Sequence, residues 1–97
     1  MSGSSVKDLS VCVVLEPLQV GWKEVEGAIV LVEMGAGAAF VLKGVSAHIW
    51  KMLSEGYQPA EIKEVLLEVY EARPEQIEAD LLEFLNSLAS QKFIHVN

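Results

Sequence analysis

The sequence predicts an α+β fold in which a three-stranded antiparallel sheet is followed by three helices, in a winged helix-turn-helix-like arrangement. Apolar residues recur with the strand period of two up to Leu42, and with the helical period of about 3.6 from Val45 onward. The chain has 97 residues, of which 52% are hydrophobic and 22% charged. This length and composition suit one folded domain with a single core.

The strands are predicted near residues 20–26, 28–34 and 38–43, because β-branched residues alternate there with polar ones and glycines interrupt the pattern. Glu26 and Gly27 suit a tight turn between the first two strands. The stretch "GAG" at 35–37 fits a hairpin loop in which glycine supplies positive φ angles.

The same glycines do not predict a nucleotide site. A dinucleotide fingerprint needs a third glycine and a helix that begins at the loop, whereas "AAFVL" continues here as a strand. A Walker loop needs Gly-Lys followed by Ser or Thr, and Lys43-Gly44 has the reverse order. We therefore expect no cofactor.

The helices are predicted over residues 45–56 and 58–72 and from Pro74 onward, with Gly56 near the end of the first helix and Pro59 in the first turn of the second. The third helix has an apolar stripe with helical spacing, formed by Ile77, Leu81, Phe84, Leu85 and Leu88. After it, "KFIHVN" leaves the helical pattern.

Composition excludes several classes of function. The formal net charge is −7, and acidic residues dominate the stretch from Glu61 to Glu83, which would repel nucleic acid. Cys12 is the only cysteine, so an internal disulfide and a cysteine-based metal site are not expected. Apolar stretches are too short to span a membrane. Residues 1–10 are expected to be a flexible tail without a secretory signal, and residues 11–97 are expected to form a single domain. We expect the protein to be cytoplasmic.

Catalysis is not predicted either. His48 and His95 are the only histidines, and neither stands in a recognisable motif with a serine or cysteine nucleophile. The aromatic residues have the spacing of core residues. The sequence therefore indicates a protein that is not an enzyme.

The third predicted strand is an edge of the sheet, and "AAFVL" carries no charge, proline or evident bulge to discourage pairing. Such an edge suits strand addition by a peptide, in which main-chain hydrogen bonds give affinity and pockets for alternate side chains give selectivity. It could also pair two copies of the chain into a homodimer.

Four segments in order resemble the PqqD-like family of peptide chaperones, named after the coenzyme PQQ synthesis protein D. They are "VGWKEVEGAIVLVE", "FVLKGVSAHIW", "GYQPAEIKEVLLEVY" and "EADLLEFLNSLASQKFI", and the resemblance covers about residues 16–96. Two positions depart from the family pattern. Lys43-Gly44 stands where many members have leucine followed by asparagine-glycine, and Gln58 stands where threonine or serine often caps the second helix.

The resemblance implies a winged-helix-like RiPP recognition element. Such a module binds the leader of a ribosomally synthesised precursor peptide and presents it to a modifying enzyme, often a radical SAM protein, in peptide natural product or PQQ-type cofactor biosynthesis. It implies strand addition to the third strand and a groove against the third helix. Carried over by position, the peptide-binding residues are Ala38, Ala39, Phe40, Val41 and Leu42 on the strand, and Ile77, Glu78, Leu81, Leu82 and Leu85 on the helix.

Two features of the third helix bear on this implied site. Leu82 lies beside the apolar stripe, so the helix is apolar over more than one core face requires. The acidic border formed by Glu75, Glu78, Asp80 and Glu83 would favour a leader that carries lysine or arginine. The alternatives are a winged-helix DNA-binding protein, which would need a basic recognition helix, and a general protein-interaction domain.

Overall fold

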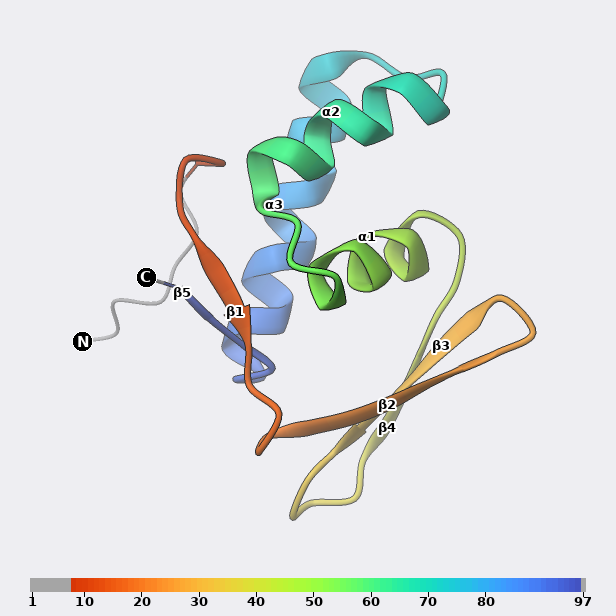
Figure 1. Ribbon diagram of the computed structural model, residues 1–97, viewed down its shortest axis with the longest axis vertical. Coiled ribbons are helices and arrows are strands. Elements are labelled where there is room, and N and C mark those ends of the chain that lie inside the picture. Colours follow the sequence, from red (N-terminus) through yellow and green to blue (C-terminus); the bar gives the residue numbers. More distant parts are fainter. Residues whose placement is uncertain (1–7, 97) are drawn as a thin grey trace.

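The computed structural model describes residues 8–96 (Figure 1). Most of the predicted N-terminal tail, residues 1–7, lies outside the described residues, while Leu9 packs into the core. The elements in order are β1 (Val13–Leu15), β2 (Val20–Val25), β3 (Ala28–Glu33), β4 (Ala39–Leu42), α1 (Val45–Ser54), α2 (Pro59–Val69), α3 (Pro74–Ser90) and β5 (Ile94–Val96). The predicted three strands and three helices are confirmed, with shorter ends.

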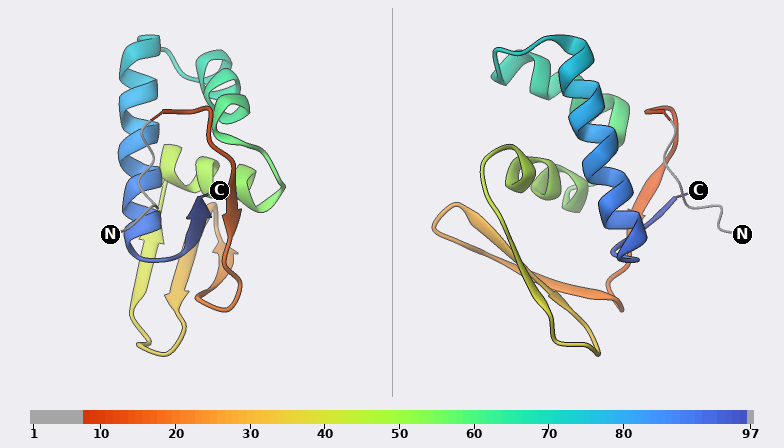
Figure 2. Two further views of the ribbon diagram at one scale, coloured as in Figure 1. Left: turned by 90° about the vertical axis from the view of Figure 1, so that its left-hand side faces the viewer. Right: turned by 180° about the vertical axis from the view of Figure 1, so that it is seen from behind.

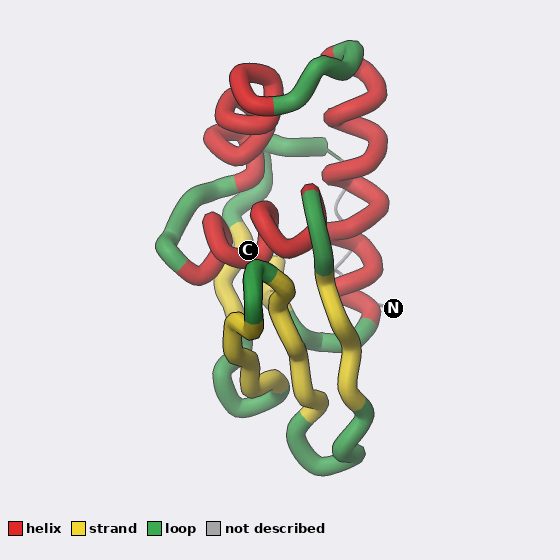
Figure 3. Tube along the Cα trace, turned by 90° about the vertical axis from the view of Figure 1, so that its right-hand side faces the viewer, coloured by secondary structure: helices red, strands yellow, loops and turns green. Residues whose placement is uncertain are grey.

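The main sheet has the order β2-β3-β4, and both pairs are antiparallel. Glu26 and Gly27 join β2 to β3 with φ angles of 52° and 85°, so both central residues of this turn are left-handed. That is the geometry of the type I′ turn, whose twist matches that of the flanking strands. Figure 3 shows the strands of the sheet next to one another, with the loops that join them.

A second sheet joins the two ends of the described chain, and the sequence did not predict it. β1 pairs antiparallel with β5, with Val13 opposite Val96 and Leu15 opposite Ile94. Figure 1 shows these two short strands beside the C-terminal half of α3, away from the main sheet. The stretch "KFIHVN" was expected only to leave the helical pattern, and it contains the strand β5.

Gln58 holds β1 against the beginning of α2. Its side-chain oxygen accepts a hydrogen bond from Val13 N at 2.8 Å, and its side-chain nitrogen donates to Val13 O at 3.3 Å. The main-chain N–H of Gln58 donates to the Glu61 carboxylate at 2.8 Å, which caps the helix start. Gln58 stands where threonine or serine often caps this helix, but here the Glu61 carboxylate caps the helix start and the side-chain amide of Gln58 binds β1.

The core lies between one face of the main sheet and the three helices, while the other face of the sheet carries no helix (Figure 2). Ile29 and Leu31 point from β3 into this core and are each 1% exposed. Trp50 of α1 is fully buried, and Trp22 of β2 packs against it edge to face at 6.2 Å between ring centroids. Alternation along β4 then fixes which of its side chains face the helices.

Candidate functional site

The main chain of β4 has one unpaired side in the part of the chain that the structure describes, because β4 is the last strand of its sheet. The N–H of Glu33 donates to Ala38 O at 2.8 Å. In an antiparallel ladder the main-chain groups of successive residues point alternately toward and away from the partner strand. Phe40 therefore points its N–H and C=O toward β3, while Ala39 and Val41 point theirs to the open edge.

The side chains of β4 divide in the same alternating way. Phe40 and Leu42 face the helices and are half-buried, and Phe40 packs edge to face on Phe93 with ring centroids 5.8 Å apart. Val41 points to the uncovered face of the sheet, where its side chain is 58% exposed. One face of β4 therefore packs toward the helices, and its other face is open to solvent.

A groove of about 490 Å³ lies between α3 and the first turns of α1. α1 begins at Val45, three residues after β4 ends at Leu42, so the groove adjoins the end of the free edge. In Figure 2, β4 lies below the C-terminal end of α3, and the chain continues upward from β4 into α1. The groove has apolar and polar lining residues, namely Val45, Ile49, Phe84, Ser46, Asp80, Glu83 and Ser87.

Three of the helix residues predicted for the groove lie in the core. Ile77 is 6% exposed, and Leu81 and Leu85 are 0% exposed, so these side chains support α3 from beneath. Leu82 is half-buried against the edge of the core. Glu78 points toward α2, where Lys63 Nζ donates to its carboxylate at 2.9 Å. Direct contact of these five residues with a peptide stays a prediction.

The side chains that line the groove from α3 are Asp80, Glu83, Phe84 and Ser87, on the flank of the helix next to the buried stripe. Phe84 is half-buried, so it packs on the core and also lines the groove. Sequence reasoning placed Phe84 in the core alone. The spacing of these four residues is itself helical, and that is the signal that could have marked a second face.

The acidic border is only partly present at the groove. Asp80 and Glu83 line it and are exposed, whereas Glu78 is paired with Lys63 on the other side of α3. The Asp80 carboxylate accepts one hydrogen bond, from the side-chain amide of Gln76 at 2.9 Å. No lysine, arginine or histidine of the described chain lines this groove, so its polar rim is negative.

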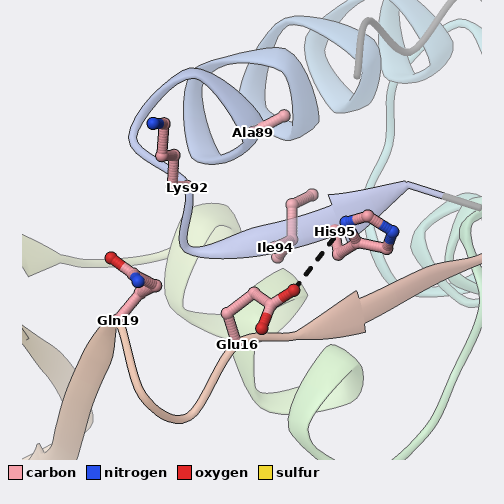
Figure 4. Close-up of a pocket in the computed structure, with 6 residues that line it drawn as sticks. All are labelled: Glu16, Gln19, Ala89, Lys92, Ile94 and His95. Carbon is pink, nitrogen blue, oxygen red and sulfur yellow. Dashed lines mark ion pairs between the residues drawn. The ribbon is translucent and has the colours of Figure 1, made fainter. Parts of the chain in front are cut away.

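A second hollow, of about 340 Å³, lies where β5 approaches the end of β1 (Figure 4). His95 Nδ1 is 3.8 Å from Glu16 Oε2 across this hollow, and both side chains are well exposed. The Glu16 main-chain N–H donates to Phe93 O at 2.9 Å, which fixes the chain leaving β1. The histidine therefore forms a surface ion pair when protonated, and no serine, threonine or cysteine is among the residues that line the hollow.

Within residues 8–96, no cluster of three or more His, Cys, Asp or Glu side chains has the arrangement of a metal site. None of the helices in this range is long and apolar enough to cross a membrane.

The sheet, the three helices and the free edge beside a groove define a small winged-helix-like α+β domain. The chain belongs to the PqqD family, whose model, described as coenzyme PQQ synthesis protein D, matches residues 28–94. The resemblance seen in the sequence is thereby confirmed. No curated protein matches the chain.

Two solved structures are similar to the chain. One is described as TbiB1 in complex with the TbiA(beta) leader peptide, with 28% sequence identity over 84% of this chain and 93% of that chain and a TM-score of 0.78. The other is a lasso peptide synthetase B1 complexed with the leader peptide. It is 23% identical over 84% of this chain and 95% of that chain, with a TM-score of 0.75, and this likeness concerns the fold.

Proposed function

We propose that this protein is a leader-peptide-binding module that captures a ribosomally synthesised precursor peptide by strand addition and presents it to a modifying enzyme. The observation that carries the proposal is the free edge of β4, where Ala39 and Val41 direct their main-chain groups outward beside a groove. Membership of the PqqD family supports it. So do the leader-peptide complexes of the similar TbiB1 and lasso peptide synthetase B1 structures.

The peptide would lie along Ala38 to Leu42 as a fourth strand of the main sheet. Each outward-pointing residue of β4 offers one donor and one acceptor, so Ala39 and Val41 together can form four main-chain hydrogen bonds with it. Alternate side chains of the peptide would then point into the groove between α1 and α3. Main-chain pairing would supply general affinity, and the groove would supply selectivity.

The module acts by binding and has no catalytic role of its own in this proposal. Its proposed partner is a modifying enzyme, for example a radical SAM protein. The two would act in peptide natural product or PQQ-type cofactor biosynthesis in the cytoplasm. The same edge can pair with a second copy of the chain, and a homodimer formed in this way would compete with the peptide. DNA binding has no support from charge, because α3 exposes Asp80 and Glu83.

The proposal is tested by titrating the protein into a fluorescently labelled leader, taken from the short open reading frame nearest to its gene, and following anisotropy. We expect a dissociation constant in the micromolar range or below. Amide hydrogen exchange followed by NMR supplies the site. The Ala39 and Val41 amides should become protected when the peptide is added, whereas the Phe40 amide is already protected in the free protein.

Two results would contradict the proposal. The first is that no peptide encoded beside the gene binds, while the protein remains folded by circular dichroism. The second is that a peptide binds without protecting the Ala39 and Val41 amides. Duplex DNA added as a competitor should leave the peptide complex unchanged.

A further inference from the structure

The groove beside β4 combines an apolar floor with an acidic rim. Val45, Ile49 and Phe84 supply the apolar surface, and Asp80 and Glu83 supply two exposed carboxylates on α3. The ion pairs among the described residues are Lys51–Glu24, Lys63–Glu78 and His95–Glu16. Neither rim carboxylate belongs to one of them, so both are available to a cationic ligand.

The spacing of these groups matches the spacing of side chains along a strand. Asp80 and Phe84 are four residues apart on α3, which corresponds to about 6 Å along the helix axis at about 1.5 Å per residue. Side chains on one face of a strand recur every second residue, about 6.5–7 Å apart. Figures 1 and 2 show that the axes of α3 and β4 are roughly parallel, with opposite chain directions, so a peptide strand that pairs with β4 and continues past its end would run along α3.

We infer that this groove selects leader peptides in which a lysine or arginine stands two residues before or after an apolar anchor residue. The inference rests on the proposed function, because it concerns the peptide added to β4. The anchor side chain would cover Phe84 and the floor beside it, and the next inward-pointing side chain would reach Asp80 and Glu83. Residues between them would point to the uncovered face of the sheet.

A cation fits this second position better than a neutral or acidic side chain. A bound peptide removes water from the rim carboxylates, and carboxylates that lose water without a partner are costly. The long alkyl stems of lysine and arginine can lie on apolar surface while their charged ends reach the rim. An acidic side chain would meet like charge. Charge complementarity of this kind contributes more to selectivity and association rate than to raw affinity.

The test uses a displayed library of random short peptides, selected against four forms of the full chain. They are the wild type, Val41→Pro, the double variant Asp80→Asn/Glu83→Gln, and a control double variant Glu64→Gln/Glu68→Gln. Glu64 and Glu68 are exposed on α2 and do not line the groove, so the control changes the net charge equally at another place. All variants are checked for folding by circular dichroism.

We expect the wild type and the α2 control to enrich peptides with lysine or arginine two positions from an apolar residue. The groove double variant should lose that preference while still enriching apolar peptides. Replacing the enriched lysine by norleucine in a synthetic peptide should weaken binding to the wild type by about tenfold and binding to the groove variant much less.

Enrichment without a basic preference, or with one that survives in the groove variant, would overturn the inference and leave the proposed function intact. A preference lost equally in the α2 control would also overturn it, because net charge would then be the cause. If the wild type enriches no peptide, or Val41→Pro leaves enrichment unchanged, the strand-addition function itself fails and the inference fails with it.

Discussion

The substitution Val41→Pro should abolish one hydrogen bond between the protein and an added strand without disturbing the hairpin. The Val41 N–H points to the open edge, so its loss removes no bond between β3 and β4. It is one of the four main-chain groups that Ala39 and Val41 present. Its removal leaves a peptide carbonyl buried without a donor, which costs about 1–3 kcal/mol. That cost corresponds to a dissociation constant that is roughly 5- to 150-fold higher.

Anisotropy titration of the labelled leader measures this change, and Val41→Ala is the matched control. Alanine shortens the same side chain but keeps the N–H, so it should bind the leader with nearly wild-type affinity. Ala39→Pro should weaken binding by a similar factor, because its N–H also points outward. If folded Val41→Pro binds the leader as well as the wild type does, the peptide does not pair with this edge as described.

Three further predictions concern the stability of the fold. Leu85→Ala should lower the free energy of unfolding by about 2–5 kcal/mol in urea denaturation, because Leu85 is fully buried beneath the groove. Gln58→Ala should destabilise β1 by about 1–3 kcal/mol, since it leaves both main-chain groups of Val13 without their partner; faster exchange of the β1 amides would show this. The hydrogen bond and charge of Glu24 raise the pKa of Lys51, so this pair stabilises the fold below the ordinary lysine pKa. The difference in thermal midpoint between wild type and Lys51→Met should therefore be present at neutral pH and vanish as pH rises through the Lys51 pKa.

The sequence predicted the main sheet and the helices because their signals are local. Alternation and the Glu26-Gly27 turn define the β2–β3 hairpin within a few residues, and Pro59 and Pro74 mark two helix starts. The β1–β5 sheet has no such signal. Each of its strands has three residues, too few to show a period, and they pair only because α3 brings the C-terminal end back to β1.

The sequence alone predicted the open edge strand of the candidate site, but it did not predict which residues line the groove. The absence of charge and proline in β4 was visible in the sequence, and the ladder then shows which residues point outward. The lining of the groove was not visible in the sequence. The apolar stripe of α3 has two flanks, and helical periodicity does not say which flank faces β4. Packing decides it, with Ile77 and Leu81 in the core and Phe93 placed against Phe40. The helix residues carried over by position therefore include buried supports of α3, and none of them lines this groove.

The charge of the chain bears on how an undefended edge can stay available. Edge-to-edge pairing of two copies would bring two chains with a formal net charge of −7 together, and with them two sets of Asp80 and Glu83 carboxylates close to each paired β4. Exposed charges act over about 8 Å at physiological ionic strength, which exceeds the separation of about 4.8 Å between neighbouring strands. A basic leader would gain from the same carboxylates that repel a second copy. The acidic groove thus favours the peptide over the homodimer, and added salt should shift that balance toward self-association.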